Sequence, residues 1–178
     1  MLGATLAFGW ASPGRAADGA PADAGGLQAL ADALLNGVRN RIADCAGSLA
    51  QVASAAAGAG LLGVERPRLN WNPRLADAAL RHADAMARTR LFDHVGADGS
   101  TVRERVDATG YRWQLVGENL AAGQLRLEEA VVDWLNSPSH CAALLDARYT
   151  EFGLARIDSD SPTDAYGTYW TLVLGRPR

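Results

Sequence analysis

The chain has 178 residues, of which 48% are hydrophobic and 21% charged, and this balance excludes a chain that is disordered throughout. Its formal net charge of −3 does not favour nucleic-acid binding, so no nucleic-acid partner is expected. No apolar run reaches the ~20 residues that a membrane-spanning helix needs, so we predict one domain with no membrane span.

The first residues are typical of an export signal. Residues 1–10 are apolar and uncharged, and small residues near Ala16 suit a cleavage site, so a signal or leader segment is predicted over residues 1–16. The basic residues that usually begin a leader are missing. The alternatives are therefore a longer leader that begins upstream and a disordered tail. Residues 17–26 are rich in Ala, Gly, Pro and Asp and are predicted to form a flexible lead-in to a domain over residues 27–178.

Apolar residues at helical spacing predict a first, amphipathic helix over residues 27–45. The stretch 46–67 has small residues and a Gly-rich centre, and is predicted to be a loop. Asn72 and Pro73 suit the N-cap and first turn of a second helix that reaches about Leu91. Its predicted buried stripe consists of Ala76, Leu80, Ala83 and Ala87.

Three shorter helices are predicted farther along the chain. Thr101 and Glu104 have the spacing of a capping box, and Gly110 suits the end of that third helix. A fourth helix is predicted over residues 127–135 from its apolar spacing. Ser137, followed by a proline, predicts the start of a short fifth helix.

The C-terminal part has the residue types of strands. Residues 149–157 and 167–174 are rich in aromatic and β-branched residues, and the polar segment 158–165 between them suits a hairpin connection. A further strand is predicted around residues 113–117. Helices followed by an antiparallel hairpin predict an α+β fold in which helices pack on a small sheet.

Three side chains are candidates for a functional site, because each lies at the boundary of a predicted element. His94 follows the second helix, Glu118 follows the strand around residues 113–117, and His140 lies in the first turn of the fifth helix. A helix N-terminus disfavours imidazolium, and a neutral imidazole suits a metal ligand or a general base. The spacing permits a His-Glu-His metal site but does not point to one, and the alternative is a histidine that only forms hydrogen bonds within its loop. His82 lies inside the second helix and is interpreted as structural.

The chain contains two cysteines, Cys45 and Cys141. In an oxidising compartment such a pair usually forms a disulfide. The alternative is a pair of free, buried thiols. A metal site made by the pair alone is not expected, because no further cysteine or histidine pattern surrounds either residue.

Four short segments occur in an order that resembles the CAP superfamily, also called the SCP-like extracellular domain, in its bacterial form. They are Phe-Asp-His at 92–94, Gly-Glu-Asn-Leu-Ala at 117–121, Trp-Leu-Asn-Ser-Pro-Ser-His at 134–140 and Tyr-Thr-Glu-Phe-Gly at 149–153. The resemblance extends from about residue 27 to residue 175. It implies an α-β-α sandwich with a small antiparallel sheet flanked by helices, and a secreted or periplasmic location.

The resemblance also implies a cleft where two histidines and two acidic residues meet, which binds a divalent metal such as zinc in some members. His94 and His140 match the two histidines, and Glu118 matches the first acidic residue. Ser137 stands where eukaryotic members have the second acidic residue, three positions after the tryptophan. Asn119 and Ser137 are expected to line the cleft, and bacterial members place cysteines at the positions of Cys45 and Cys141, which favours the disulfide.

Members of the superfamily are linked to binding of lipids or sterols, to host interaction and, in older proposals, to proteolysis. We therefore predict a non-enzymatic binding module outside the cytoplasm, whose cleft holds a small ligand, such as a lipid, or a divalent metal. One alternative is a hydrolase in which Glu118 or a histidine acts as general base, with or without zinc. Another is a purely structural His-Glu-His set. No catalytic residue is assigned.

Overall fold

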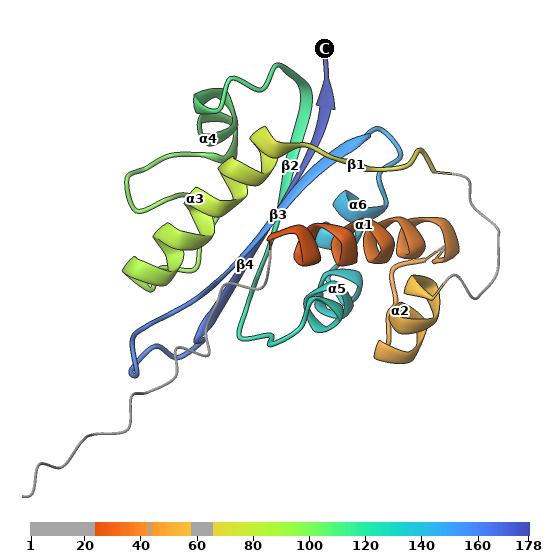
Figure 1. Cartoon of the computed structure of the whole chain (residues 1–178), viewed down its shortest axis with the longest axis horizontal. Helices are drawn as coiled ribbons and strands as arrows, with labels where there is room; N and C mark the ends of the chain where they lie inside the picture. The colour runs from red at the N-terminus through yellow and green to blue at the C-terminus, as the bar shows by residue number, and fades with distance from the viewer. Residues whose placement is uncertain (1–23, 43, 58–65) are drawn as a thin grey trace, which may run out of the picture.

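Six helices and four strands form in the part of the chain that this computed structural model describes, which comprises residues 24–42, 44–57 and 66–178 (Figure 1). The helices are α1 (Ala24–Arg41), α2 (Leu49–Ala56), α3 (Pro73–Thr89), α4 (Val102–Ala108), α5 (Leu127–Asn136) and α6 (Pro138–Leu145). The strands are β1 (Asn70–Trp71), β2 (Trp113–Ala122), β3 (Glu151–Asp158) and β4 (Thr168–Pro177). The predicted leader, residues 1–16, lies outside the described residues.

The four strands form one sheet in the order β1-β3-β4-β2. The hairpin of β3 and β4 is antiparallel, as predicted, and β2 adds antiparallel to β4. The two-residue β1 pairs parallel to β3, so the sheet is mixed rather than wholly antiparallel. The predicted α+β class is confirmed, and β2 forms one edge of the sheet.

Helices cover both faces of the sheet, which confirms the α-β-α sandwich. In Figure 1, α3 and α4 lie on one side of the strands, and α1, α2, α5 and α6 lie on the other. Successive side chains of β4 point to opposite faces of the sheet, so both faces are apolar and both are covered by helices. Trp170, Leu172 and Leu174 pack in the larger core with α1, α5 and α6, whereas Val173 packs with α3 and α4, and Tyr169 with the end of α3.

Helix α3 begins as predicted, because the side chain of Asn72 accepts hydrogen bonds from the N–H groups of Arg74 and Leu75. The predicted buried stripe was partly wrong, since Leu80 is 47% exposed. The buried face instead consists of Leu75, Ala78, Ala79, His82, Ala83, Met86 and Ala87. The spacing of apolar residues along α3 does not show which of two neighbouring stripes of small residues is buried. The packing of the helix against the sheet makes that choice.

The loop predicted over residues 46–67 contains a helix, so that prediction was wrong for α2. Ser48 and Gln51 form a capping box at its start, and Val52 and Ala55 are buried. The first helix ends at Arg41, earlier than predicted. Helical periodicity is recognised over a window of about 11–18 residues, and α2 has only eight, which is why sequence spacing did not reveal this helix.

The extent of β2 corrects one further prediction. The strand continues to Ala122, so Glu118 lies inside it and not just past its end. A carboxylate is tolerated within the strand because charged partners reach it there.

The predicted disulfide is present between Cys45 and Cys141, whose Cα atoms are 5.6 Å apart. It connects the segment between α1 and α2 to the first turns of α6. No helix among the described residues is long and apolar enough to cross a membrane.

Candidate functional site

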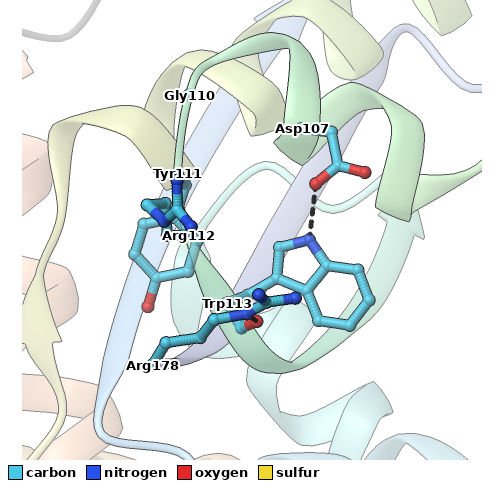
Figure 2. Close-up of a pocket in the computed structure, with 6 residues that line it drawn as sticks. All are labelled: Asp107, Gly110, Tyr111, Arg112, Trp113 and Arg178. Atoms are coloured by element: carbon cyan, nitrogen blue, oxygen red, sulfur yellow. Dashed lines mark hydrogen bonds between the residues drawn. The ribbon is translucent and has the colours of Figure 1, made fainter.

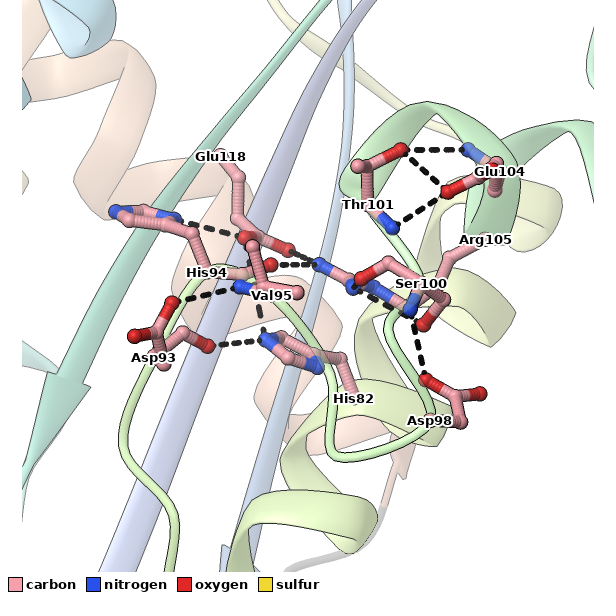
Figure 3. A network of polar contacts seen from close by, with 10 residues as sticks. All are labelled: His82, Asp93, His94, Val95, Asp98, Ser100, Thr101, Glu104, Arg105 and Glu118. Atoms are coloured by element: carbon pink, nitrogen blue, oxygen red, sulfur yellow. Dashed lines mark hydrogen bonds and ion pairs between the residues drawn. The ribbon is translucent and has the colours of Figure 1, made fainter.

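Glu118 is the centre of a polar network on the face of the sheet that α3 and α4 cover (Figure 3). Its side chain is only 2% exposed. One carboxylate oxygen, Oε1, accepts a hydrogen bond from Nδ1 of His94 at 2.9 Å. The other, Oε2, accepts from Nη2 of Arg105 at 2.8 Å. The buried charge is therefore paired at both oxygens, which offsets its loss of hydration.

Arg105 also fixes the loop that carries His94. Its guanidinium donates to the backbone oxygen of Ser100 at 2.7 Å and to that of His94 at 3.0 Å. Arg105 lies on α4 and is 8% exposed. Sequence reasoning missed this residue, because one arginine among many carries no local signal for burial.

His82 lies beneath this network, in the buried face of α3. Its Nε2 is 3.0 Å from the backbone oxygen of Asp93 and 4.0 Å from Oε1 of Glu118. Burial lowers the pKa of His82, which keeps its ring neutral. The hydrogen bond to the residue before His94 fits the structural interpretation of His82.

His140 reaches the site from the opposite face of the sheet. The ring centroids of His94 and His140 are 6.2 Å apart, and the rings are tilted by 47°. Asn119, the neighbour of Glu118 on β2, donates from Nδ2 to the backbone oxygen of His140 at 2.9 Å. Because β2 is an edge strand, side chains from both faces can meet around it. Ser137 is the N-cap residue of α6, but its side chain makes no capping hydrogen bond.

The two imidazoles have opposite electrostatic environments. The hydrogen bond that His94 donates to the carboxylate of Glu118 raises the pKa of His94. Burial, followed by the nearby His94, lowers the pKa of His140. The sequence predicted a neutral His140 because of the helix dipole. In the structure, burial and the neighbouring ring of His94 are the main causes that favour the neutral ring.

The donor set suits a metal ion only in part. Among the described residues, no three His, Cys, Asp or Glu side chains are arranged so that they could hold a metal ion. Both oxygens of Glu118 are already engaged, so this residue does not fit as a direct ligand. The second ring nitrogen of His94 points away from Glu118 (Figure 3), and a carboxylate behind a histidine commonly orients it toward a metal. The residues therefore fit a two-imidazole site with Glu118 as a positioning residue.

A separate pocket of about 410 Å³ lies at the start of β2 (Figure 2). Its lining residues are Asp107, Gly110, Tyr111, Arg112, Trp113 and Arg178. The indole nitrogen of Trp113 donates to Asp107 at 2.7 Å. None of these residues belongs to the predicted site.

Comparison with known proteins identifies the family. Residues 33–174 match the model of the CAP family, described as the cysteine-rich secretory protein family. The chain belongs to this family. The resemblance of its four sequence segments to the bacterial CAP superfamily is thus confirmed.

Two solved bacterial structures resemble this CAP domain. An extracellular protein of Bacillus anthracis str. Ames that contains an SCP domain has a TM-score of 0.55 and 26% identity, over 70% of this chain and 37% of that one. An outer surface protein of Borrelia burgdorferi has a TM-score of 0.55 and 27% identity, over 62% of this chain and 78% of that one. These neighbours are extracellular or outer-surface proteins.

Two proteins of Bacillus subtilis strain 168 are similar in sequence. The uncharacterized membrane protein YlbC is 32% identical over 87 residues, which are 49% of this chain and 25% of YlbC. The uncharacterized protein YkwD is 28% identical over 103 residues, which are 58% of this chain and 37% of YkwD. The CAP domain thus matches only a minor part of each relative.

Proposed function

We propose that this CAP domain acts outside the cytoplasm as a binding module whose polar anchor is the pair His94 and His140. One observation carries the proposal. Glu118 accepts the hydrogen bond of Nδ1 of His94, so the other ring nitrogen of His94 remains available. The ring of His140 lies close to it, with 6.2 Å between the two ring centroids. A disulfide and extracellular structural neighbours support the location.

The ligand class that we propose is a divalent metal such as zinc, or a small ligand that hydrogen-bonds to imidazole. Imidazole nitrogen is a preferred zinc donor, and the contact between Glu118 and His94 is typical of support behind a metal ligand. When bound, zinc would supply open coordination positions to a ligand. Exposed apolar side chains near His94 supply a surface for an apolar part of such a ligand, as in a lipid. They are Phe92, Val95 and Tyr166.

The alternative, a hydrolase, has less support. A general base must reach the water that it activates. Glu118 is 2% exposed and both its oxygens accept hydrogen bonds, so it is poorly placed for that role. His140, whose pKa is lowered, is the better candidate base.

Zinc titration by calorimetry tests the binding proposal. Dialysed protein should bind one zinc ion near pH 7.5, and the His94→Ala and His140→Ala variants should each lose this binding. Glu118→Gln should weaken it about 10- to 100-fold, as expected for a positioning residue. The affinity should rise with pH through the raised pKa of His94, because a proton must leave before the metal binds. Asp160→Ala, at an exposed site in the β3–β4 connection, is the matched control.

Two outcomes would contradict this proposal. The first is zinc binding of equal affinity in wild type and in both histidine variants. The second is turnover of a peptide, ester or glycan substrate that His140→Ala abolishes, which would favour the hydrolase.

A further inference from the structure

We propose that the pocket at the start of β2 is a second binding site, and that its ligand is a small phosphate monoester. The guanidinium groups of Arg112 and Arg178 hold the phosphate, and the indole of Trp113 contacts the organic part of the ligand. Trp113 precedes Glu118 by five residues, which is roughly 15 Å along an extended strand. This site is therefore separate from the pair of imidazoles, and its ligand is independent of the zinc ion proposed there.

Positive charge is concentrated around this pocket. Arg112 and Arg178 line it, and the guanidinium of Arg103 lies 5.8 Å from the centroid of the Trp113 ring, which also lines it. Asp107 is the one carboxylate side chain among the lining residues. Three guanidinium groups thus accompany one carboxylate, on a chain whose formal net charge is −3. Such a local excess of positive charge in a concave site attracts anions.

The arginines that line the pocket have donors that no carboxylate occupies. Arg112 is exposed, and its side chain forms no hydrogen bond or ion pair with the described residues. Arg178 donates from Nε to the backbone oxygen of Trp113 at 3.0 Å, which leaves both its Nη groups available. A guanidinium presents its donors as a rigid fork that matches the oxygens of phosphate. Many arginines elsewhere in the described chain are instead paired with Asp or Glu, namely Arg68, Arg81, Arg88, Arg126, Arg148 and Arg156.

Hydrogen bonds hold the residues around the pocket in place. The backbone N–H of Arg178 donates to the backbone oxygen of Arg112 at 3.1 Å, which joins the end of the chain to the segment that enters β2. Tyr111 is buried, and its hydroxyl donates to Oε2 of Glu151 on β3 at 2.6 Å. A site whose frame is already formed loses little freedom when a ligand binds.

Trp113 supplies an apolar wall beside the guanidinium groups. Its indole nitrogen donates to Oδ1 of Asp107 at 2.7 Å, which fixes the ring and occupies its one polar atom (Figure 2). The ring is partly exposed, so the surface that it offers to a ligand is carbon. A cationic and an aromatic group side by side suit a ligand with an anionic and an organic part, and the volume of about 410 Å³ is typical of small-molecule pockets.

The balance of charges favours phosphate over carboxylate as the anionic group. The guanidinium groups of Arg103, Arg112 and Arg178 exceed the single carboxylate of Asp107 by two positive charges. A phosphate monoester carries a charge of about −2 near pH 7.5 and has three strong acceptor oxygens. A carboxylate carries one negative charge and has two oxygens, so it leaves part of this donor set without a partner.

Calorimetry with metal-free protein near pH 7.5 tests the ligand class. The probes are glucose 6-phosphate, adenosine 5′-monophosphate, inorganic phosphate and glucuronate. At least one of the two esters should bind with a Kd of about 1 mM or lower, and at least threefold more tightly than inorganic phosphate and glucuronate. The tighter ester then shows whether the organic part is a sugar or a nucleoside. No binding of either ester, or binding no tighter than that of inorganic phosphate or glucuronate, would overturn the inference.

Variants of the lining residues test the location. Arg112→Gln should weaken binding of the tighter ester at least fivefold, and Arg112→Lys should weaken it less, because lysine keeps the charge but not the fork. Asp107→Asn should strengthen binding at least twofold, because it removes a negative charge and keeps an acceptor for the indole of Trp113. Arg88→Gln removes the same charge from an exposed ion pair on the last turns of α3, and as the matched control it should change affinity less than twofold.

Three outcomes with these variants would overturn the inference. The first is an ester affinity that Arg112→Gln leaves unchanged. The second is an equal loss in Arg112→Gln and Arg88→Gln, which would mean that the overall charge attracts the ester. The third is ester binding that His94→Ala abolishes and Arg112→Gln preserves, which would place the ester at the imidazoles. Zinc binding is measured in a separate titration, so either proposal can fail while the other stands.

Discussion

At the scale of single residues, the site depends on how one buried carboxylate is neutralised. Glu118 is paired with Arg105 from α4 and His94 from the preceding loop. A buried charge without partners is costly, and these two partners offset the burial of Glu118. The functional consequence is that the ring of His94 is held in one orientation, with its second nitrogen available.

The pairing of His94 with Glu118 should make stability depend on pH. Because the pKa of His94 is raised above its ordinary value of 6.5, the folded protein holds this proton more tightly than the unfolded chain. The stabilisation is fully present below the unfolded pKa and is lost as pH rises through the folded pKa. The difference in unfolding free energy between wild type and His94→Gln should therefore be largest near about pH 5.5 and smallest near about pH 8.5.

Urea unfolding of both proteins across this pH range is the measurement. Taking the difference removes the part of the contribution of His82 and His140 that burial causes, which is the largest cause of their lowered pKa values and acts in the opposite direction. The side chain of His94 is 55% exposed, so the effect should be modest. A difference that stays constant with pH would show that this ion pair does not act on stability.

At the scale of elements, α3 lies unusually close to β3. A Cβ atom added to Gly153 would lie 2.0 Å from the backbone nitrogen of Ala76. The absence of a side chain there allows the helix backbone to approach the strand. This close approach holds the first turn of α3 against β3.

Gly153→Ala should consequently destabilise the domain by about 3 kcal/mol, since it overfills a tightly packed contact. Thermal or urea unfolding measures the loss. The double variant with Ala76→Gly should not recover stability, because the nearest atoms belong to the backbone of α3. Recovery in the double variant would mean that a side chain, and not the helix backbone, causes the clash.

At the scale of the whole molecule, the disulfide joins parts of the chain that are 96 residues apart. Cys141 directly follows His140, so the bond also holds the helix that contributes one of the two imidazoles. A second contact holds the same region, because Asn136 and the backbone of Gly47 exchange two hydrogen bonds.

Reduction of this disulfide should lower the free energy of unfolding by about 2–4 kcal/mol, chiefly because the unfolded chain gains freedom. Calorimetry with and without a phosphine reductant measures the change. The double variant Cys45→Ala and Cys141→Ala should show the lower stability in both conditions. A wild-type melting temperature that the reductant does not alter, with free thiols confirmed by mass, would exclude a stabilising role.

The sequence by itself determined where most elements begin, and it identified the family. Asn72 with Pro73 and the capping box of Thr101 and Glu104 act within four residues of themselves, so their effect can be recognised locally. The alternation of β4 is likewise a property of neighbouring residues. The family motifs also indicated His94, Glu118 and His140 as the candidate site residues.

Only the tertiary structure decided how these residues meet. Arg105 and Glu118 are 13 residues apart, and His94 and Glu118 are 24 apart, so their contacts depend on how α4 and the loop after α3 pack on β2. The burial of Glu118 inside a strand and the free edge beside it follow from the order of the strands. Local sequence preferences extend over a few residues, whereas the site is formed by packing between elements that are distant along the chain.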